Sequence, residues 1–227
     1  MHFYKEIMSK LLSKLLTIGN KGIAMPVNRL ISLSEIIFGL AMTMLVFALE
    51  IPEVDASEAE FISIIKEDLE IFLIFLITFI LLVIYWLGNV KRFSYIIATN
   101  KTHLFIELLG LFFILILPFT NGLISVHPDY RIVVIIYAVD LILIGLFAYW
   151  GWSYASHNHQ LIKKEVSKET IQEIKNELII EPVVVSISLV AGLLKPSLFN
   201  LCMILIPIVH VLLSKFRKRN DVQLESK

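Results

Sequence analysis

The stretch RLISLSEIIFGLAMTMLVFALEIPE, from Arg29 to Glu53, decides the class of fold. Its apolar run is typical of a helix that crosses a bilayer, because about 17–25 mostly apolar residues span the hydrocarbon layer. Polar residues occur at two places in it: Arg29, Ser34 and Glu35 lie near its start, and Thr43 lies near its middle. Because charged groups at membrane depth face protein or water, we expect this helix to do more than anchor the chain.

The composition extends this interpretation to the whole chain. Of the 227 residues, 57% are hydrophobic and only 18% are charged, whereas about 25% are charged in a typical soluble domain. The formal net charge is zero, which gives no electrostatic reason to expect nucleic-acid binding. A single cysteine, Cys202, excludes an intrachain disulfide and a multi-cysteine metal site. The composition therefore predicts an all-α integral membrane protein.

The apolar residues fall into six segments. These segments cover residues 30–51, 71–87, 104–124, 132–155, 182–194 and 198–213. The last two are short, and Lys195–Pro196 separates them, so we expect a hairpin of two crossings or, alternatively, a re-entrant hairpin. The fifth helix is expected to include residues 177–180 as its first turn, since proline is tolerated early in a helix. Residues 1–28 have apolar residues at helical spacing between lysines, which predicts an amphipathic helix on the membrane surface.

Loop charges orient these segments. Basic residues gather before segment one and after segments two, four and six, and they include Lys5, Lys10, Lys14, Lys21, Lys91, Arg92, Lys101, Lys163, Lys164, Lys168, Lys175, Lys215, Arg217, Lys218 and Arg219. The loop after segment one is acidic and holds Glu50, Glu53, Asp55, Glu58 and Glu60. The positive-inside rule then predicts six crossings in the cell membrane with both termini cytoplasmic. Residues 29–215 form the predicted membrane domain, and residues 216–227 form a basic cytoplasmic tail.

Four ionisable residues stand out inside the apolar segments: Glu35, Glu107, Asp140 and His210. We expect Asp140 to hydrogen-bond to another helix, with proton carriage as an alternative role. Glu107 is either solvated at the inner interface or buried, and His210 is expected to pack near the interface. The sequence contains no catalytic motif, no metal-ligand spacing and no phosphate-binding glycine loop, so we expect neither an enzyme nor a cofactor.

The first segment has two faces when it is drawn as a helix. At about 100° per residue, one stripe contains Ile36, Leu40, Thr43, Met44, Phe47 and Ile51. Ser34 and Glu35 point away from this stripe. The pattern alone allows the stripe to face lipid, a neighbouring helix or a pore.

The same segment resembles the first-helix motif of the transmembrane protein 175 family of potassium-permeable channels. That motif has an arginine, then phenylalanine–serine–aspartate, and later a threonine. Arg29, Ser34 and Thr43 occupy matching positions, while Leu33 and Glu35 replace the phenylalanine and the aspartate. Weaker matches follow in order: YWLGNVKRF resembles the end of the family's second helix, LLGLFFILILPFTNGLI its third helix, and EPVVVSISLVAGLLKPSLFNL a late segment.

The resemblance implies a homotetramer with four first helices around a central pore. By position, the pore-lining residues would be Leu40, Thr43 or Met44, and Phe47, forming rings that constrict the pore with hydrophobic side chains. A second implied group anchors the helix, and its members are Arg29, Ser34, Glu35, Trp86 and Asn89. Asn89 stands where the family usually has histidine, and Phe47 is bulkier than the aliphatic residue expected in that ring.

The resemblance thus implies a potassium-permeable cation channel whose apolar constriction gates by dewetting. Its partners would be the bilayer and monovalent cations, and its acidic outer loop would concentrate those cations. An alternative is a proton-coupled secondary transporter that uses Asp140 and Glu35 as carriers. A third possibility is a membrane scaffold without transport.

Overall fold

The computed structural model describes residues 6, 26–49 and 69–203. Within these ranges the regular secondary structure is helical, apart from one isolated β-bridge between Ile96 and Ile162. The elements are α2 (Val27–Met44), η1 (Leu45–Ala48), α4 (Leu69–Tyr95), α5 (Lys101–Val126), α6 (Arg131–Ser156), η2 (His157–His159), α7 (Lys168–Leu194) and α8 (Pro196–Met203). The acidic loop, His210 and the basic tail lie outside the described residues, as does the predicted amphipathic segment apart from residues 6 and 26–28.

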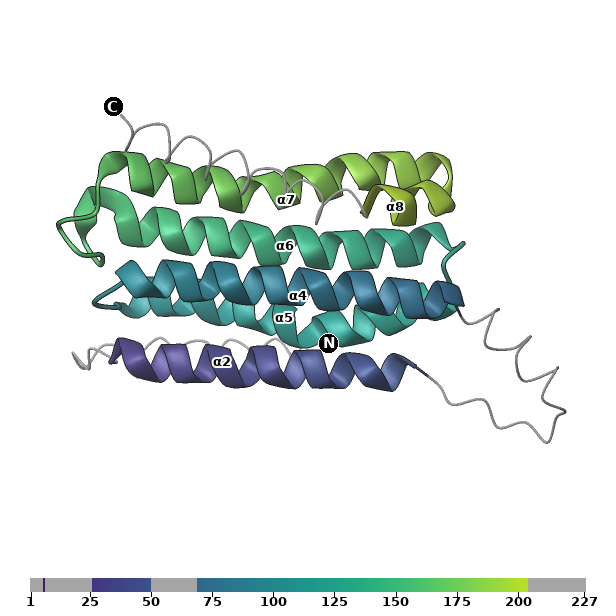
Figure 1. Cartoon of the computed structure of the whole chain (residues 1–227), viewed down its shortest axis with the longest axis horizontal. Coiled ribbons are helices and arrows are strands. Elements are labelled where there is room, and N and C mark those ends of the chain that lie inside the picture. Colours follow the sequence, from purple (N-terminus) through teal and green to yellow (C-terminus); the bar gives the residue numbers. More distant parts are fainter. Residues whose placement is uncertain (1–5, 7–25, 50–68, 204–227) are drawn as a thin grey trace, which may run out of the picture.

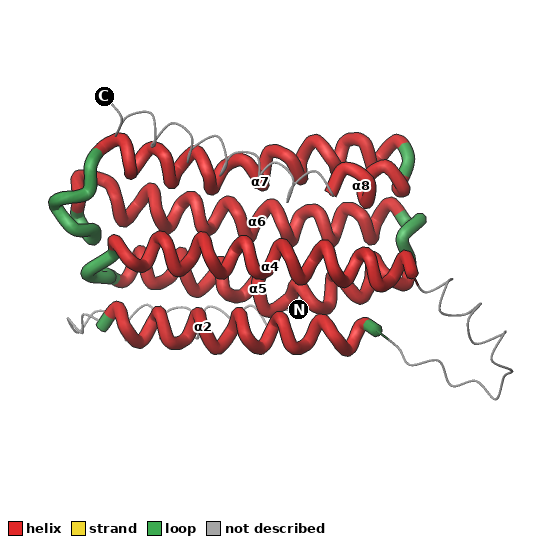
Figure 2. Tube along the Cα trace, in the orientation of Figure 1, coloured by secondary structure: helices red, strands yellow, loops and turns green. Residues whose placement is uncertain are grey.

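The long helices run side by side along the length of the molecule (Figures 1 and 2). Helix α5 packs against α6, and α6 packs against α7, while α2 lies at the edge of the bundle and contacts α5 and α4. Five of the described helical spans are long and apolar enough to cross a membrane. This confirms the predicted all-α class, whereas most of the predicted sixth crossing lies beyond the end of α8.

Polar caps fix where two of these helices begin. The Asn100 side chain accepts a hydrogen bond from the His103 backbone N–H at 3.0 Å, at the start of α5. Ser167 does the same for the Thr170 N–H at 3.2 Å, at the start of α7. Such caps satisfy N–H groups that have no partner within the helix. The loops before α5 and before α7 also bond to each other, with the Ile97 N–H donating to the Leu161 carbonyl at 2.9 Å.

The fifth helix is longer than expected from the sequence. It begins at Lys168 rather than near residue 177, and Pro182 lies in its interior. Proline lacks the N–H of the helical ladder, and its ring needs space beside the neighbouring turn. Gly145 of α6 provides that space, because a Cβ at Gly145 would lie 2.5 Å from Pro182 Cγ. The polar residues 168–177, which lie before the predicted fifth helix, are therefore the first three turns of α7.

Candidate pore helix and its anchoring network

Helix α2 has one buried face and one exposed face. Its buried side chains recur every three or four residues and are Leu30, Ser34, Phe38 and Ala41, so this face packs against the bundle. The other face is apolar but exposed: Ile36 is 66% exposed, Leu40 46% and Met44 42%. Phe47, in the short η1 helix that follows, is 79% exposed. Nothing else in the single described chain covers this second face.

Thr43 supplies the polar group on the exposed face. Its hydroxyl donates a hydrogen bond to the Gly39 carbonyl one turn earlier, at 2.8 Å. The hydroxyl proton is therefore engaged within the helix, and the lone pairs of the oxygen are available to an outside group. This arrangement suits contact with a cation better than contact with an anion.

The buried face of α2 is joined to α4 by a hydrogen bond. The Asn89 amide donates to Ser34 Oγ at 3.0 Å, and Ser34 Oγ donates to the Ile31 carbonyl at 2.7 Å. Ser34 is 1% exposed and Asn89 is 6% exposed. The structure therefore brings together two of the five residues in the predicted anchoring group.

The network continues from Asn89 to a buried ion pair. Asn89 Oδ1 accepts from Arg92 Nη2 at 2.9 Å, and Arg92 Nη1 donates to Glu107 Oε1 at 2.8 Å. The Arg92 and Glu107 side chains are only 5% and 6% exposed. A charged group buried in this way is stable only with a close partner of opposite charge. We had counted Arg92 as a loop charge, but it belongs to the last turn of α4 and points into the bundle.

Three further groups complete the surroundings of Glu107. His103 Nε2 lies 3.4 Å from Glu107 Oε1, and His103 Nδ1 lies 2.9 Å from Thr99 Oγ1. Gly151 of α6 faces the carboxylate, and a Cβ at Gly151 would collide with Glu107 Oε1. The glycine therefore allows α6 to approach the ion pair closely. The polar chain runs from α2 through α4 to α5, and α6 covers it.

The remaining predicted anchoring residues lie elsewhere. Arg29, Glu35 and Trp86 are exposed in the single chain, and no described hydrogen bond or ion pair connects them to Ser34 or Asn89. Their part in anchoring remains a prediction. Sequence reasoning missed the partnership of Arg92 with Glu107, although opposite charges on both sides of the short α4–α5 connection were a usable signal.

Two more polar contacts lie deeper in the bundle. Asp140 of α6 accepts a hydrogen bond from Thr120 Oγ1 of α5 at 2.7 Å, an interhelical bond of the kind expected for it. Tyr85 of α4 donates a hydrogen bond to Glu181 Oε1 of α7. Glu181 was absent from our candidate residues, although its position directly before a proline in an apolar run marked it as unusual. The described residues contain no cluster of three or more histidine, cysteine, aspartate or glutamate side chains that suits a metal ion.

Comparison with known proteins finds relatives of this chain among potassium channels. The family described as endosomal/lysosomal potassium channel TMEM175 matches residues 29–118, which include α2, α4 and the first part of α5. A potassium channel of Chamaesiphon minutus is 21% identical over 156 residues, covering 66% of this chain and 76% of that protein. The chain is thus similar to TMEM175 potassium channels over its first described helices. The match begins at Arg29, the first residue of the resemblance found in the sequence.

Solved structures of the TMEM175 family share the fold. The crystal structure of a lysosomal potassium-selective channel TMEM175 homologue from Chamaesiphon minutus has a TM-score of 0.71 at 19% identity, covering 82% of this chain and 97% of that one. A variant of the potassium channel MtTMEM175, solved with a nanobody fusion, has a TM-score of 0.55 at 16% identity and covers 87% and 96%. The chain is thus a multi-pass membrane protein with the fold of these TMEM175 structures, and the relatives that it matches are named as potassium channels.

Proposed function

We propose that the chain forms a potassium-permeable cation channel whose pore is lined by α2. The observation that carries this proposal is the exposed apolar face of α2, in a helix whose opposite face is locked to the bundle through Ser34 and Asn89. A helix fixed in rotation on one side presents a constant set of side chains on the other. The TMEM175 relatives are named as potassium channels, which supports assigning that outward face to a pore.

In this proposal four copies of the chain assemble around the pore axis. Leu40, Met44 and Phe47 form rings that narrow the pore, and dewetting of these rings closes it. Thr43 adds a ring of hydroxyl oxygens between the apolar rings and contacts a partly dehydrated cation. The permeant ion is potassium, and conduction requires no cofactor.

The proposed channel unit comprises residues 29–215 and crosses the cell membrane six times, with both termini in the cytoplasm. The amphipathic segment 1–28 lies on the inner membrane surface, and the basic tail 216–227 extends into the cytoplasm. The support is the distribution of lysine and arginine between alternate loops. The loops that precede α5 and α7 bond to each other, so they share one side of the membrane, as this topology requires.

The arrangement of the carboxylates weighs against a relay between Asp140 and Glu35. Asp140 is buried in α6 and bonded to Thr120, whereas Glu35 is exposed on α2. No described hydrogen bond or ion pair connects the two. A proton-coupled transporter that passes protons between them would need such a connection.

The test is ion flux through purified protein in liposomes. A channel predicts potassium flux that rises without saturation as the potassium gradient increases, together with step-like single-channel currents in planar bilayers. Saturable uptake that requires a proton gradient and is lost in Asp140→Asn would favour the transporter instead. An absence of flux from correctly folded protein would refute both.

A further inference from the structure

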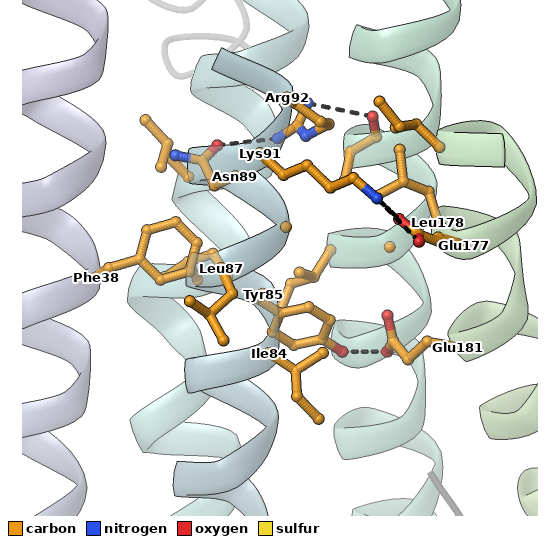
Figure 3. A pocket seen from close by; sticks show the side chains of 18 of the residues that line it. Phe38, Ile84, Tyr85, Leu87, Asn89, Lys91, Arg92, Glu177, Leu178 and Glu181 are labelled. Carbon is orange, nitrogen blue, oxygen red and sulfur yellow. Dashed lines mark hydrogen bonds and ion pairs between the residues drawn. The ribbon is translucent and has the colours of Figure 1, made fainter. Parts of the chain in front are cut away.

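A cavity of about 570 Å³ lies between α4 and α7, with α5 and α6 forming its floor. Its walls are mostly aliphatic, and they include Ile80 and Ile84 of α4, Ile114 of α5 and Ile144 of α6. Phe38, from the buried face of α2, closes one side (Figure 3). This size lies within the range of about 300–1,000 Å³ that is common for small-molecule sites. The cavity is distinct from the exposed face of α2.

The charges around the cavity are paired, with one exception. Lys91 bonds to Glu177 at 2.8 Å, and Arg92 bonds to Glu107 at 2.8 Å. These two pairs leave one carboxyl group in the lining, that of Glu181, which has no cationic partner among the described residues. A pocket with three carboxylates and two cations therefore has a local excess of one acidic group.

The position of Glu181 is suited to meeting a ligand. It is 4% exposed, and one of its oxygens, Oε1, is held by the Tyr85 hydroxyl across the cavity (Figure 3). The other oxygen, Oε2, has no hydrogen-bond partner within the described part of the chain. Gly145 lies beside it, since a Cβ there would be 2.8 Å from Oε2. The hydroxyl thus orients the carboxyl group and leaves one oxygen for another donor.

From this geometry we infer that the cavity binds a small organic cation with an apolar body, such as a hydrophobic primary amine. The ammonium group donates to Glu181 Oε2, and the apolar body lies among the aliphatic side chains of α4, α5 and α6. A carboxylate that is buried without a cation gains most from a charged donor, because such hydrogen bonds are roughly twice as strong as neutral ones. The site does not depend on ion conduction through α2.

Phenylbutylamine and phenylbutanol test this inference as a matched pair of probes. They share the same apolar body and differ in the charge of the terminal group. Calorimetric titration of the purified protein in detergent micelles measures binding, and titration into empty micelles gives the correction for partitioning. We expect the amine to bind the wild-type protein at least about tenfold more tightly than the alcohol, because a hydrogen bond to a charged group contributes more than a neutral one.

Two variants and a control locate the site. Glu181→Gln removes the charge at nearly constant size, and it should weaken amine binding by about tenfold or more. Gly88→Leu places a side chain where a Cβ meets no atom within 4 Å, and because Gly88 lines the cavity it should block both probes. The control Asp129→Asn removes an exposed charge in the loop between α5 and α6 and should leave binding unchanged.

Other outcomes would overturn the inference. Equal affinity for the amine and the alcohol would indicate a site for neutral, lipid-like molecules. Unchanged amine binding in both Glu181→Gln and Gly88→Leu would place the amine elsewhere. If Glu181→Gln fails to fold, Gly88→Leu decides alone, since it retains the carboxylate. Absence of amine binding to folded wild-type protein would also refute the proposal.

Discussion

The buried ion pair between Arg92 and Glu107 provides a quantitative test of the network that holds α2 in the bundle. Replacing Arg92 by leucine leaves the Glu107 carboxylate, with a side chain 6% exposed, without its cation. Removing one partner of a buried pair typically costs about 3–5 kcal/mol. His103 Nε2 stays within 3.4 Å of the same carboxylate oxygen in this variant, so we expect a loss of about 3 kcal/mol of unfolding free energy, at the lower end of this range.

The adjacent residue provides a matched control. Lys91 pairs with Glu177 at the same distance of 2.8 Å, but the two side chains are 38% and 25% exposed. Exposed pairs contribute only about 0–1 kcal/mol, so Lys91→Leu should lower the unfolding free energy by less than about 1 kcal/mol. The assay is equilibrium unfolding of purified protein in detergent, followed by tryptophan fluorescence.

The double variant Arg92→Leu/Glu107→Gln separates loss of attraction from burial of an unpaired charge. Because it leaves no unpaired charge, it should recover most of the stability that Arg92→Leu loses. Two results would refute the reasoning. One is equal destabilisation by Arg92→Leu and Lys91→Leu; the other is a double variant no more stable than Arg92→Leu alone.

Two further predictions concern the pore and the approach of α6. Thr43→Val keeps the shape of the side chain but removes its oxygen, so we expect an altered potassium/sodium permeability ratio, measured from reversal potentials; an identical ratio would remove Thr43 from ion selection. Gly151→Ala should destabilise the protein by about 1–3 kcal/mol, because its Cβ collides with Glu107 Oε1. Gly122→Ala, whose Cβ meets no atom within 4 Å, should be neutral or stabilising in the same unfolding assay, and equal effects of the two changes would contradict this argument.

The apolar runs of the sequence predicted most of the described helices. These runs predicted the start of α4 and both ends of α5 and α6 to within a few residues. They missed the last turns of α4, which carry charged residues. The start of α7 was missed because its first turns are polar and because Pro182 resembled a residue near a helix start. In the structure the proline is buried in mid-helix, where the lack of a side chain on Gly145 gives its ring room. The space for the proline ring comes from a glycine on another helix, so the sequence around Pro182 does not indicate it.

The polar contacts were harder to predict than the helices. Asp140 was expected to bond to another helix, and it bonds to Thr120. Arg92 was assigned to a loop, because hydropathy treats a lysine or arginine at the end of an apolar run as a boundary. Its burial depends on Glu107, which is 15 residues along the chain. The pairing of Tyr85 with Glu181 joins residues 96 positions apart, and a single sequence does not indicate such contacts.

The exposed face of α2 was easier to predict than the buried polar contacts. The stripe containing Leu40, Met44 and Phe47 was recognisable from the spacing of its residues, and the structure places these side chains on the exposed side of the helix. In the proposed channel, this stripe faces the pore formed by four subunits, which one chain does not contain. The family resemblance supplied that interpretation, which is why it is tested by conduction rather than by the fold of one chain.

Single-channel recording of Leu40→Ala beside Leu73→Ala tests the central claim most directly. The two leucines are 46% and 48% exposed in the single chain, but Leu40 lies on α2 and Leu73 lies on α4. If α2 lines a pore with a hydrophobic constriction, Leu40→Ala will widen that constriction and raise potassium conductance or open probability. Leu73→Ala will leave both unchanged. Wild-type currents in the Leu40→Ala protein, or the same increase in both variants, would contradict an α2-lined pore narrowed at Leu40.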